Sequence, residues 1–205
     1  MSPPPAARSA TLARRPQRAD GRRNYDNILA AARTAFDEGG TSASLEDIAR
    51  AAGVAIGTLY GHFPTREALI EATMRDGLDQ LRASADALAE TENPAAALTL
   101  WFRQAVAHCS TFRGLVGLLA TSSYDEGTPL HHACVAMHES CGQLLRRAQG
   151  SGHVRADLSP DDLFTMITSA AWTRENATAD HDPSDRLIDL LLDAIIRTGR
   201  ETSAG

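Results

Sequence analysis

The stretch of residues 42–67, SASLEDIARAAGVAIGTLYGHFPTRE, constrains the fold of this chain more than any other feature of its sequence. Ser44, with Asp47 three residues later, is an N-cap with a variant of the capping box, so a helix is expected to begin after it. Gly53 ends that helix, because glycine adopts the left-handed conformation without strain. A second, very short helix follows, with apolar residues available to a core. Two short helices around a Gly turn form the unit that places its second helix in the major groove of DNA.

The same stretch resembles a known family. LEDIARAAGVAIGTLYGHF followed by TREALI is similar to the signature of TetR-type repressors, a large family of bacterial one-component regulators. Upstream, residues 28–40 (ILAAARTAFDEGG) resemble that family's first helix, and the resemblance covers residues 22–75 in all. Ala55 departs from the common form, in which Ser or Thr often caps the recognition helix, and this weakens the helix start by about 1 kcal/mol. Arg66 replaces a frequent Lys and preserves the positive charge.

The resemblance implies an all-α chain, with an N-terminal three-helix helix-turn-helix domain and a C-terminal helical domain for effector binding and dimerisation. The expected boundaries are residues 1–21 for a disordered tail, 22–66 for the DNA-binding domain and 67–205 for the second domain. An alternative for the Pro-, Ala- and Arg-rich tail is a mobile arm that adds phosphate or minor-groove contacts. The implied function is a DNA-binding transcriptional repressor, which a small-molecule effector releases from a pseudo-palindromic operator.

The resemblance also predicts which residues contact DNA. Those expected at phosphates are Ser44, Tyr60, His62 and Arg66. Those expected near base edges are Ile56, Gly57 and Thr58, and Leu45 and Glu46 complete the predicted set. Gly57 has no side chain to hold the helix away from the groove.

The charge distribution agrees with this prediction, although the net charge of −6 does not at first sight. Residues 1–66 hold nine Arg against six acidic residues, a net charge of +3. Residues 67–205 hold eleven Arg against twenty acidic residues, a net charge of −9. A basic N-terminal part on an acidic remainder would orient the protein toward phosphate.

The composition excludes other classes of protein. No run of about 18 apolar residues is present, so no membrane span is expected, and three cysteines, an odd number, suit the cytoplasm. The sequence contains no GxGxxG, P-loop, CxxC or HExxH motif, and no residue pair has a spacing tied to a reaction. We therefore expect a cytoplasmic protein that is not an enzyme and needs no cofactor.

Past the motif the pattern predicts helices almost throughout. The first begins near Thr65 and the second at Asn93-Pro94. A third covers FRGLVGLLATSSY up to a DEGTP turn, and a fourth spans residues 130–149. The fifth runs from Ser159-Pro160 to about Asn176, and the last covers residues 185–200.

The last of these helices, DRLIDLLLDAIIRTGR, is apolar on most sides, so it must be covered on two of them. One cover is the protein's own core. The other is a second subunit, because this helix and the one before it resemble the C-terminal helices through which TetR-type repressors dimerise. The alternative is a fully internal helix in a monomer. The residues predicted at the homodimer interface are Phe164, Ile167, Ala171, Leu187, Leu191 and Ile195.

His131, Cys134, His138 and Cys141 share one helical face at steps of 3, 4 and 3. Such side chains suit zinc or copper, and thiols can sense oxidants, so a metal- or thiol-responsive regulator that uses residues 131–141 is the alternative function. A single helix cannot wrap four ligands around one ion, so ordinary packing or a polar-lined effector pocket without metal are the other interpretations. The residues predicted to line an effector pocket are Trp101, Phe102, Leu118, Tyr124, His131, Cys134, Met137, His138, Cys141 and Trp172.

Overall fold

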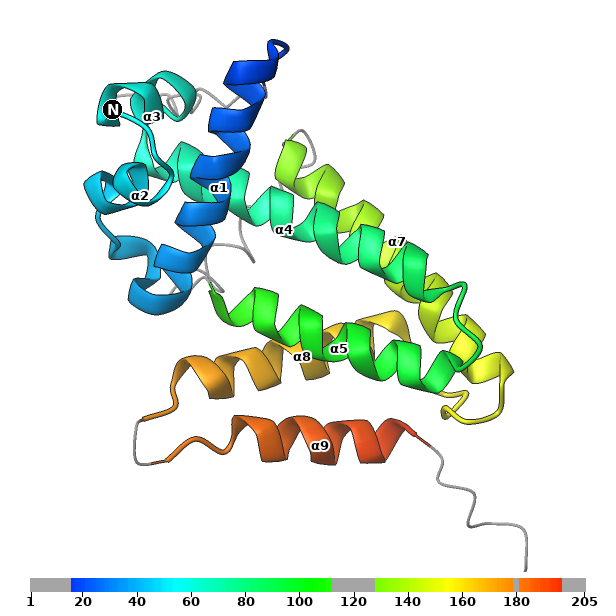
Figure 1. Ribbon diagram of the computed structural model, residues 1–205. Helices are drawn as coiled ribbons and strands as arrows, with labels where there is room; N and C mark the ends of the chain where they lie inside the picture. Colours follow the sequence, from blue (N-terminus) through cyan, green and yellow to red (C-terminus); the bar gives the residue numbers. More distant parts are fainter. Residues whose placement is uncertain (1–15, 112–127, 179–180, 197–205) are drawn as a thin grey trace, which may run out of the picture. The chain divides into compact units, whose positions relative to one another are not determined.

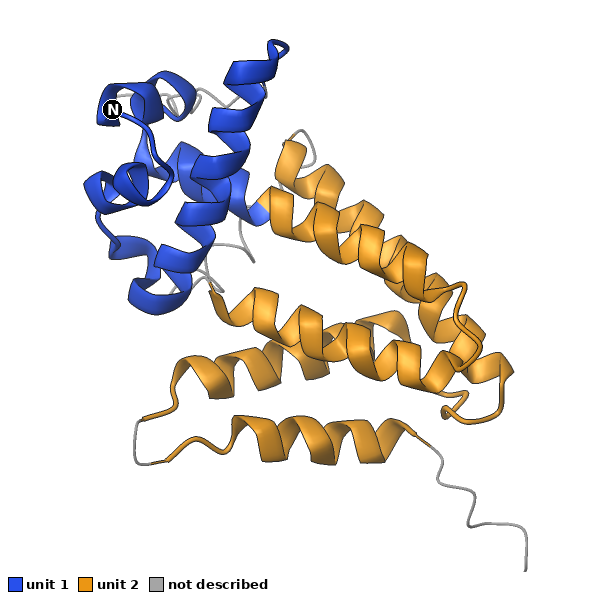
Figure 2. Cartoon of the chain, viewed as in Figure 1, with its two compact units in different colours: residues 1–74 blue, residues 75–205 orange. Residues whose placement is uncertain are grey.

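A computed structural model describes residues 16–111, 128–178 and 181–196 of the chain (Figure 1). The chain divides into two compact units between Met74 and Arg75 (Figure 2). Within the described ranges the regular structure is helical, apart from two isolated β-bridges, and this confirms the all-α prediction. None of the described helices has the length and apolar character that crossing a membrane requires.

The first unit contains the predicted helix-turn-helix. Its elements are α1 (Ala19–Gly39), the 3-10 turn η1 (Gly40–Ser42), α2 (Leu45–Ala51), α3 (Ile56–His62) and the start of α4 (Arg66–Leu88). Helix α1 packs against η1, α2 and α3. The core consists of buried apolar side chains at helical spacing, namely Ile28, Leu29, Ala32, Phe36, Ile48, Leu59, Phe63 and Leu69. Because α1 begins at Ala19, residues 19–21 are helical and do not belong to the expected tail, whose first fifteen residues lie outside the described ranges.

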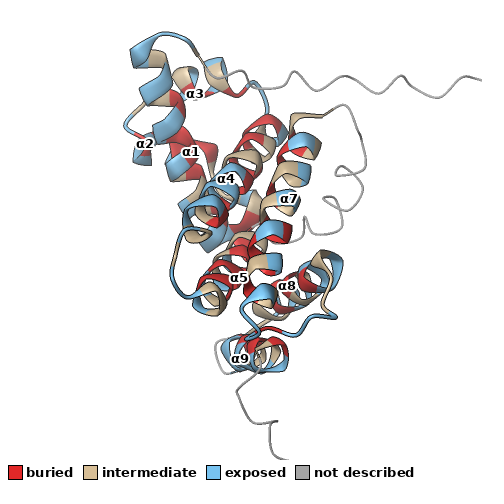
Figure 3. Cartoon of the chain, turned by 90° about the vertical axis from the view of Figure 1, so that its right-hand side faces the viewer, coloured by how far each residue is buried: buried red, intermediate tan, exposed pale blue. Residues whose placement is uncertain are grey.

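The second unit consists of the rest of α4 and four further described helices, α5 (Pro94–Thr111), α7 (Pro129–Gly150), α8 (Pro160–Glu175) and α9 (Ser184–Ile195). Helix α5 packs against α7 and α8, and α9 packs against α8. The buried residues of α5 form the centre of this unit, and Figure 3 shows the buried faces turned toward one another. The indole Nε1 of Trp101 donates to the carbonyl of Leu81 at 2.9 Å and so ties α5 to α4.

Three of the helix starts expected from the sequence are confirmed by side-chain caps. The hydroxyl of Thr65 accepts from the backbone N–H of Ala68 at 3.1 Å, and the side chain of Asn93 accepts from that of Ala96 at 3.0 Å. Ser159 forms a complete capping box with Asp162 at the start of α8. The helix expected over FRGLVGLLATSSY lies outside the described residues.

The prediction that the last helix extends to residue 200 is wrong. Helix α9 ends at Ile195, and Ile196 is extended, with φ −88° and ψ 121°. Ile196 forms an antiparallel bridge with Val154, and the N–H of Arg155 donates to the carbonyl of Ile195 at 3.0 Å. The chain leaves the helix here because its backbone pairs with the α7–α8 connection, a contact between residues far apart in the sequence.

Candidate nucleic-acid interface

Helix α2 has the start and the end that the sequence predicts. The Oγ of Ser44 accepts from the N–H of Asp47 at 3.2 Å. The Asp47 carboxylate pairs with Arg50 at 2.5 Å, so this acid serves an ion pair on the surface of α2. After α2, Gly53 has φ +70°, and the N–H groups of Gly53 and Val54 donate back into the last turn. Together these bonds form a Schellman motif, which turns the chain sharply into α3.

Helix α3 buries only Leu59 among its seven residues. Ile56 and Tyr60 lie on the surface, with 37% and 45% of their areas exposed. A Cβ atom built at Gly57 would meet no neighbour within 4 Å. As expected from the sequence, Ala55 provides no side-chain cap. One side of this short helix is therefore uncovered by the protein and carries no side chain at Gly57.

The end of α3 is supported by α1. The ring of Tyr25 lies 4.8 Å from that of Phe63 and 6.1 Å from that of His62, edge to face in the second case. Phe63 is fully buried, whereas His62 is half-buried. Packing on α1 thus fixes the orientation of α3, while the imidazole of His62 stays partly accessible.

The structure revises the prediction for the start of α2. Leu45 is buried, with 6% of its area exposed, so its side chain belongs to the core and only its backbone could reach a phosphate. Glu46 is exposed, and its carboxylate accepts from the hydroxyl of Ser44 at 3.2 Å. The Ser44 hydroxyl is therefore shared between capping α2 and holding Glu46.

Arg66 has partners that the sequence did not indicate. Its Nη1 donates to the carbonyl of Thr41 at 3.0 Å and to that of Ala43 at 2.5 Å. Its side chain thus turns toward the connection between η1 and α2. The predicted phosphate contact of Arg66 has to be made by its other guanidinium nitrogens.

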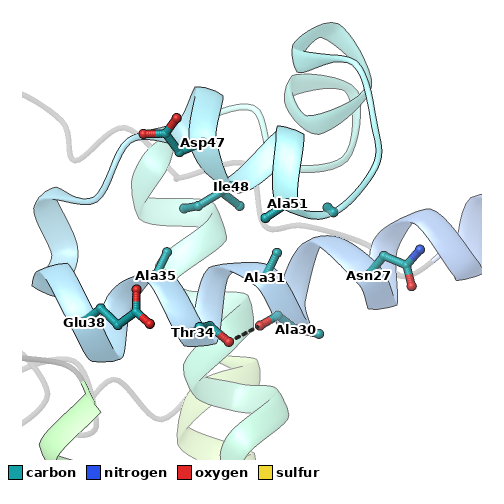
Figure 4. Close-up of a pocket in the computed structure, with 10 residues that line it drawn as sticks. Asn27, Ala30, Ala31, Thr34, Ala35, Glu38, Asp47, Ile48 and Ala51 are labelled. Carbon is teal, nitrogen blue, oxygen red and sulfur yellow. Dashed lines mark hydrogen bonds between the residues drawn. The ribbon is translucent and has the colours of Figure 1, made fainter.

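A groove of about 670 Å³ lies between α1 and α2 on the first unit (Figure 4). Small side chains leave it open, and its polar groups include the carboxylates of Glu38 and Asp47. Carboxylates repel phosphate, so this groove is not suited to binding nucleic acid. The lining residues are Asn27, Ala30, Ala31, Thr34, Ala35, Glu38, Asp47, Ile48, Ala51 and Ala52.

The residues predicted to line an effector pocket separate into two groups in the second unit. Trp101, Phe102, Met137 and Cys141 are buried. Trp172, by contrast, has 61% of its area exposed on α8, so the structure places it on the surface and not in an interior pocket. Leu118 and Tyr124 lie outside the described residues.

His138 also lies at the surface of the second unit. Its Nε2 is 3.3 Å from a carboxylate oxygen of Asp161, and its ring is 6.2 Å from that of Phe164. A hollow of about 410 Å³ next to it is lined by His138, Glu139, Gly142, Gln143, Arg146 and Pro160.

The cysteines have the properties of packed residues. Burial and, to a smaller extent, nearby Cys134 together raise the pKa of the Cys109 thiol to about 12, and burial raises the pKa of Cys141 to about 12. At neutral pH Cys109 and Cys141 are therefore protonated and weak nucleophiles. Among the described side chains, no three His, Cys, Asp or Glu gather as a metal ion would require. His131 and Cys134 are half-buried on α7.

The predicted dimer residues also differ in burial. Ile167, Ala171 and Ile195 are buried within the unit. Phe164 is 42% exposed, and Leu187 and Leu191 are half-buried. Leu190, which is 50% exposed, is not among the predicted interface residues, because a helix that is apolar on most sides does not reveal which side faces outward.

Comparisons with known proteins match both parts of the chain. Residues 28–73 match the family of bacterial regulatory proteins of the tetR type, and residues 93–195 match the C-terminal domain of SbtR-like transcriptional regulators. The chain is 31% identical over 140 residues to the HTH-type transcriptional repressor KstR2 of Rhodococcus jostii, a match that covers 68% of this chain and 55% of that repressor. The chain thus spans little more than half the length of this curated relative.

Two solved structures resemble the whole chain more evenly. A TetR transcriptional regulator of Streptomyces coelicolor is 36% identical, with 84% of this chain and 98% of that chain covered and a TM-score of 0.69. A TetR transcription regulatory protein of Mycobacterium vanbaalenii is 30% identical, with 89% of this chain and 100% of that chain covered and a TM-score of 0.65.

Proposed function

Because the chain belongs to the TetR family of bacterial regulatory proteins, whose members are transcriptional regulators and not enzymes, we propose that it is a repressor that reads a DNA operator with α3. The observation that carries this proposal is the uncovered face of α3, where Ile56 and Tyr60 are exposed and Gly57 has open space beside it. Because Gly57 carries no side chain, the helix backbone can approach base edges closely at this position. Acting on an operator places the protein in the cytoplasm of a bacterial cell.

The proposed contacts divide by the chemistry of the side chains. Ile56, Gly57 and Thr58 approach base edges in the first turn of α3. Ser44, Tyr60 and His62 carry polar groups suited to phosphate oxygens, with the backbone of Leu45 and Glu46 nearby at the start of α2. Phosphate contacts position the protein, whereas base contacts specify the sequence.

A binding-site selection with the full-length protein and a pool of random duplexes tests this division. We expect one pseudo-palindromic sequence to be recovered, with half-sites about one helical turn apart. The Thr58→Ala variant should recover an altered sequence. The Tyr60→Phe variant should recover the wild-type sequence with uniformly weaker binding. Recovery of random sequences by the wild-type protein would refute the proposed function.

We further propose that the protein acts as a homodimer through α8 and α9. Leu187, Leu190, Leu191 and Ala194 are exposed or half-buried and fall at steps of 3, 1 and 3, which places them in one stripe along α9. On α8, Phe164 and Trp172 are exposed at a spacing of eight residues, with half-buried Thr168 between them. Apolar stripes of this kind on two neighbouring helices suit a second copy of the same face.

The effector is proposed to be an apolar or aromatic small molecule bound among the helices of the second unit. The buried aromatic pair Trp101 and Phe102 on α5, with Met137 on α7, supports this chemistry. An effector that favours a conformation with mismatched half-site spacing would weaken operator binding, and by linkage the operator would weaken effector binding by the same factor.

Tryptophan fluorescence can follow this coupling, because the chain has two tryptophans in opposite environments. In a Trp172→Phe variant, the signal comes from buried Trp101 alone. Candidate apolar compounds would be titrated with and without the selected operator. A compound with equal affinity in the two titrations is not the inducer, and finding only such compounds would contradict the proposed release.

A further inference from the structure

Arg66, the first residue of α4, connects two helix starts that are far apart in the sequence. Its Nη1 donates to the carbonyls of Thr41 and Ala43, 25 and 23 residues earlier. These carbonyls flank Ser42 and lie directly before Ser44, the N-cap of α2. A single half-buried guanidinium group thus joins the start of α4 to the start of the helix-turn-helix.

An arginine is suited to this connection for a geometric reason. One Nη of the guanidinium carries two N–H groups in a fixed plane, so it can serve two carbonyls at once, and its charge strengthens both hydrogen bonds. Lysine has the same charge, but its ammonium is a compact group on a flexible stem and lacks the planar fork. An exchange of Arg66 for Lys therefore keeps the charge and changes the connection.

The Thr41–Ala43 turn is linked through α2 to α3, the helix that is proposed to read the bases. Ser44 begins α2, α2 packs against α1 and α3, and α3 carries the proposed base contacts. Helix α4 continues past Met74 into the second unit, so a displacement along α4 would reach the Thr41–Ala43 turn through Arg66.

From this arrangement we infer that Arg66 is a positioning residue for DNA recognition, which holds the helix-turn-helix on α4 in the orientation that brings α3 into register with the bases. The inference rests on the proposed operator binding by α3. It differs from a phosphate contact, for which the positive charge alone would be sufficient.

The Arg66→Lys variant separates the two roles. Binding of the full-length protein to the selected operator and to an unrelated duplex of equal length would be measured over a range of salt concentrations. We expect operator affinity to fall about tenfold, the size of effect when one charge-assisted hydrogen bond is lost. Affinity for the unrelated duplex and the salt dependence of both should stay unchanged, because the charge is kept.

Arg82→Lys is the matched control, since Arg82 is exposed on α4 and pairs with Asp86 at 3.7 Å. It should bind both duplexes as the wild type does. If Arg66→Lys also bound both as the wild type does, charge alone would matter and the inference would be wrong. An equal fall for both duplexes would indicate a loss of folded protein and would also overturn it. A wild-type protein that did not discriminate between the duplexes would refute the proposed function itself.

Discussion

Among the described residues, the apolar side chains exposed on α3 and those exposed on α9 form surfaces of different kinds, which support different proposed partners. On α3, Ile56 and Tyr60 are separated by glycine and polar groups on a helix of only seven residues. On α9, a stripe of leucines continues along a helix of twelve residues, beside the exposed rings of α8. A continuous apolar face gains free energy by meeting another apolar face. A face interrupted by Gly and by polar tips suits the close approach of a grooved, charged polymer. Exposure alone therefore does not indicate a partner, and it is the continuity of the exposed face that supports the two proposed partners.

The largest effect is expected from a charge on the α9 stripe. Leu190→Asp should convert the proposed dimer to a monomer and weaken operator binding about 100-fold or more, because the two helix-turn-helix domains would no longer bind the operator as one unit. Light scattering and operator titration measure the two consequences. Leu100→Asp is the matched control, since Leu100 on α5 is 48% exposed and lies outside the stripe. A Leu190→Asp variant that remained dimeric would place the interface elsewhere.

Ile195, which the sequence predicts at the interface, is not a suitable site for this charge. Ile195 is 1% exposed, so Ile195→Asp would bury a carboxylate inside the unit and unfold it. Such a variant would lose dimerisation for a reason unrelated to the interface.

On α3, a side chain added at Gly57 should have opposite effects on the stability of the fold and on operator binding. Gly57→Leu should stabilise the fold by up to about 1 kcal/mol, because leucine favours a helix more than glycine does. It should also weaken operator binding about tenfold or more, as a mismatched base pair does, because the side chain would enter the groove. Thermal melts and operator titration provide the two measurements.

Gly150→Leu at the end of α7 is the control, since a Cβ atom built at that glycine would also meet no neighbour within 4 Å. It should leave operator binding unchanged. If Gly57→Leu changed the oligomeric state and left DNA binding intact, α3 would be a protein interface and the contrast with α9 would disappear.

The two serine caps allow a smaller, matched comparison between the units. Ser44→Ala on α2 and Ser159→Ala on α8 should each cost about 1 kcal/mol, which lowers the melting temperature by about 2–4 °C in a chain of this size. Only Ser44→Ala should also weaken operator binding, because only that hydroxyl lies at the proposed phosphate contacts. Equal operator affinities for the two variants would remove Ser44 from the interface.

The smallest effect concerns pH at the start of α8. Hydrogen bonds from the side chain and then the backbone of Ser159 hold the pKa of Asp162 below its usual value of 3.8. The ionised carboxylate therefore stabilises the folded state above that value, and the contribution is lost as the pH falls through the folded-state pKa. Asp162→Asn should lower the melting temperature at pH 7, and its difference from the wild type should shrink as the pH falls below 3.8. A constant difference at all pH values would mean that the charge does not contribute.

Local signals predicted the helix-turn-helix well. Ser44 caps α2, Gly53 adopts a positive φ after it, and Ala55 leaves α3 uncapped, as the sequence indicated. Leu45 and Trp172 show the limit of such signals. Leu45 is predicted from the sequence to contact DNA but is buried in the core, whereas Trp172 is predicted to line a pocket but is exposed. Whether an apolar residue is buried depends on its neighbours in space, which the sequence pattern does not give.

Local patterns in the sequence were sufficient to predict the described helices and most of their starts, because caps and glycine turns act over three or four residues of continuous chain. Packing in three dimensions fixes which side of α9 is buried, with Ile188, Leu192 and Ile195 inside and Leu190 outside. It also decides that Arg66 bonds to carbonyls 23 and 25 residues away, and that the backbone after Ile195 pairs with Val154 instead of continuing the helix. These outcomes depend on residues that become neighbours only when the chain folds, so no pattern along the sequence contains them.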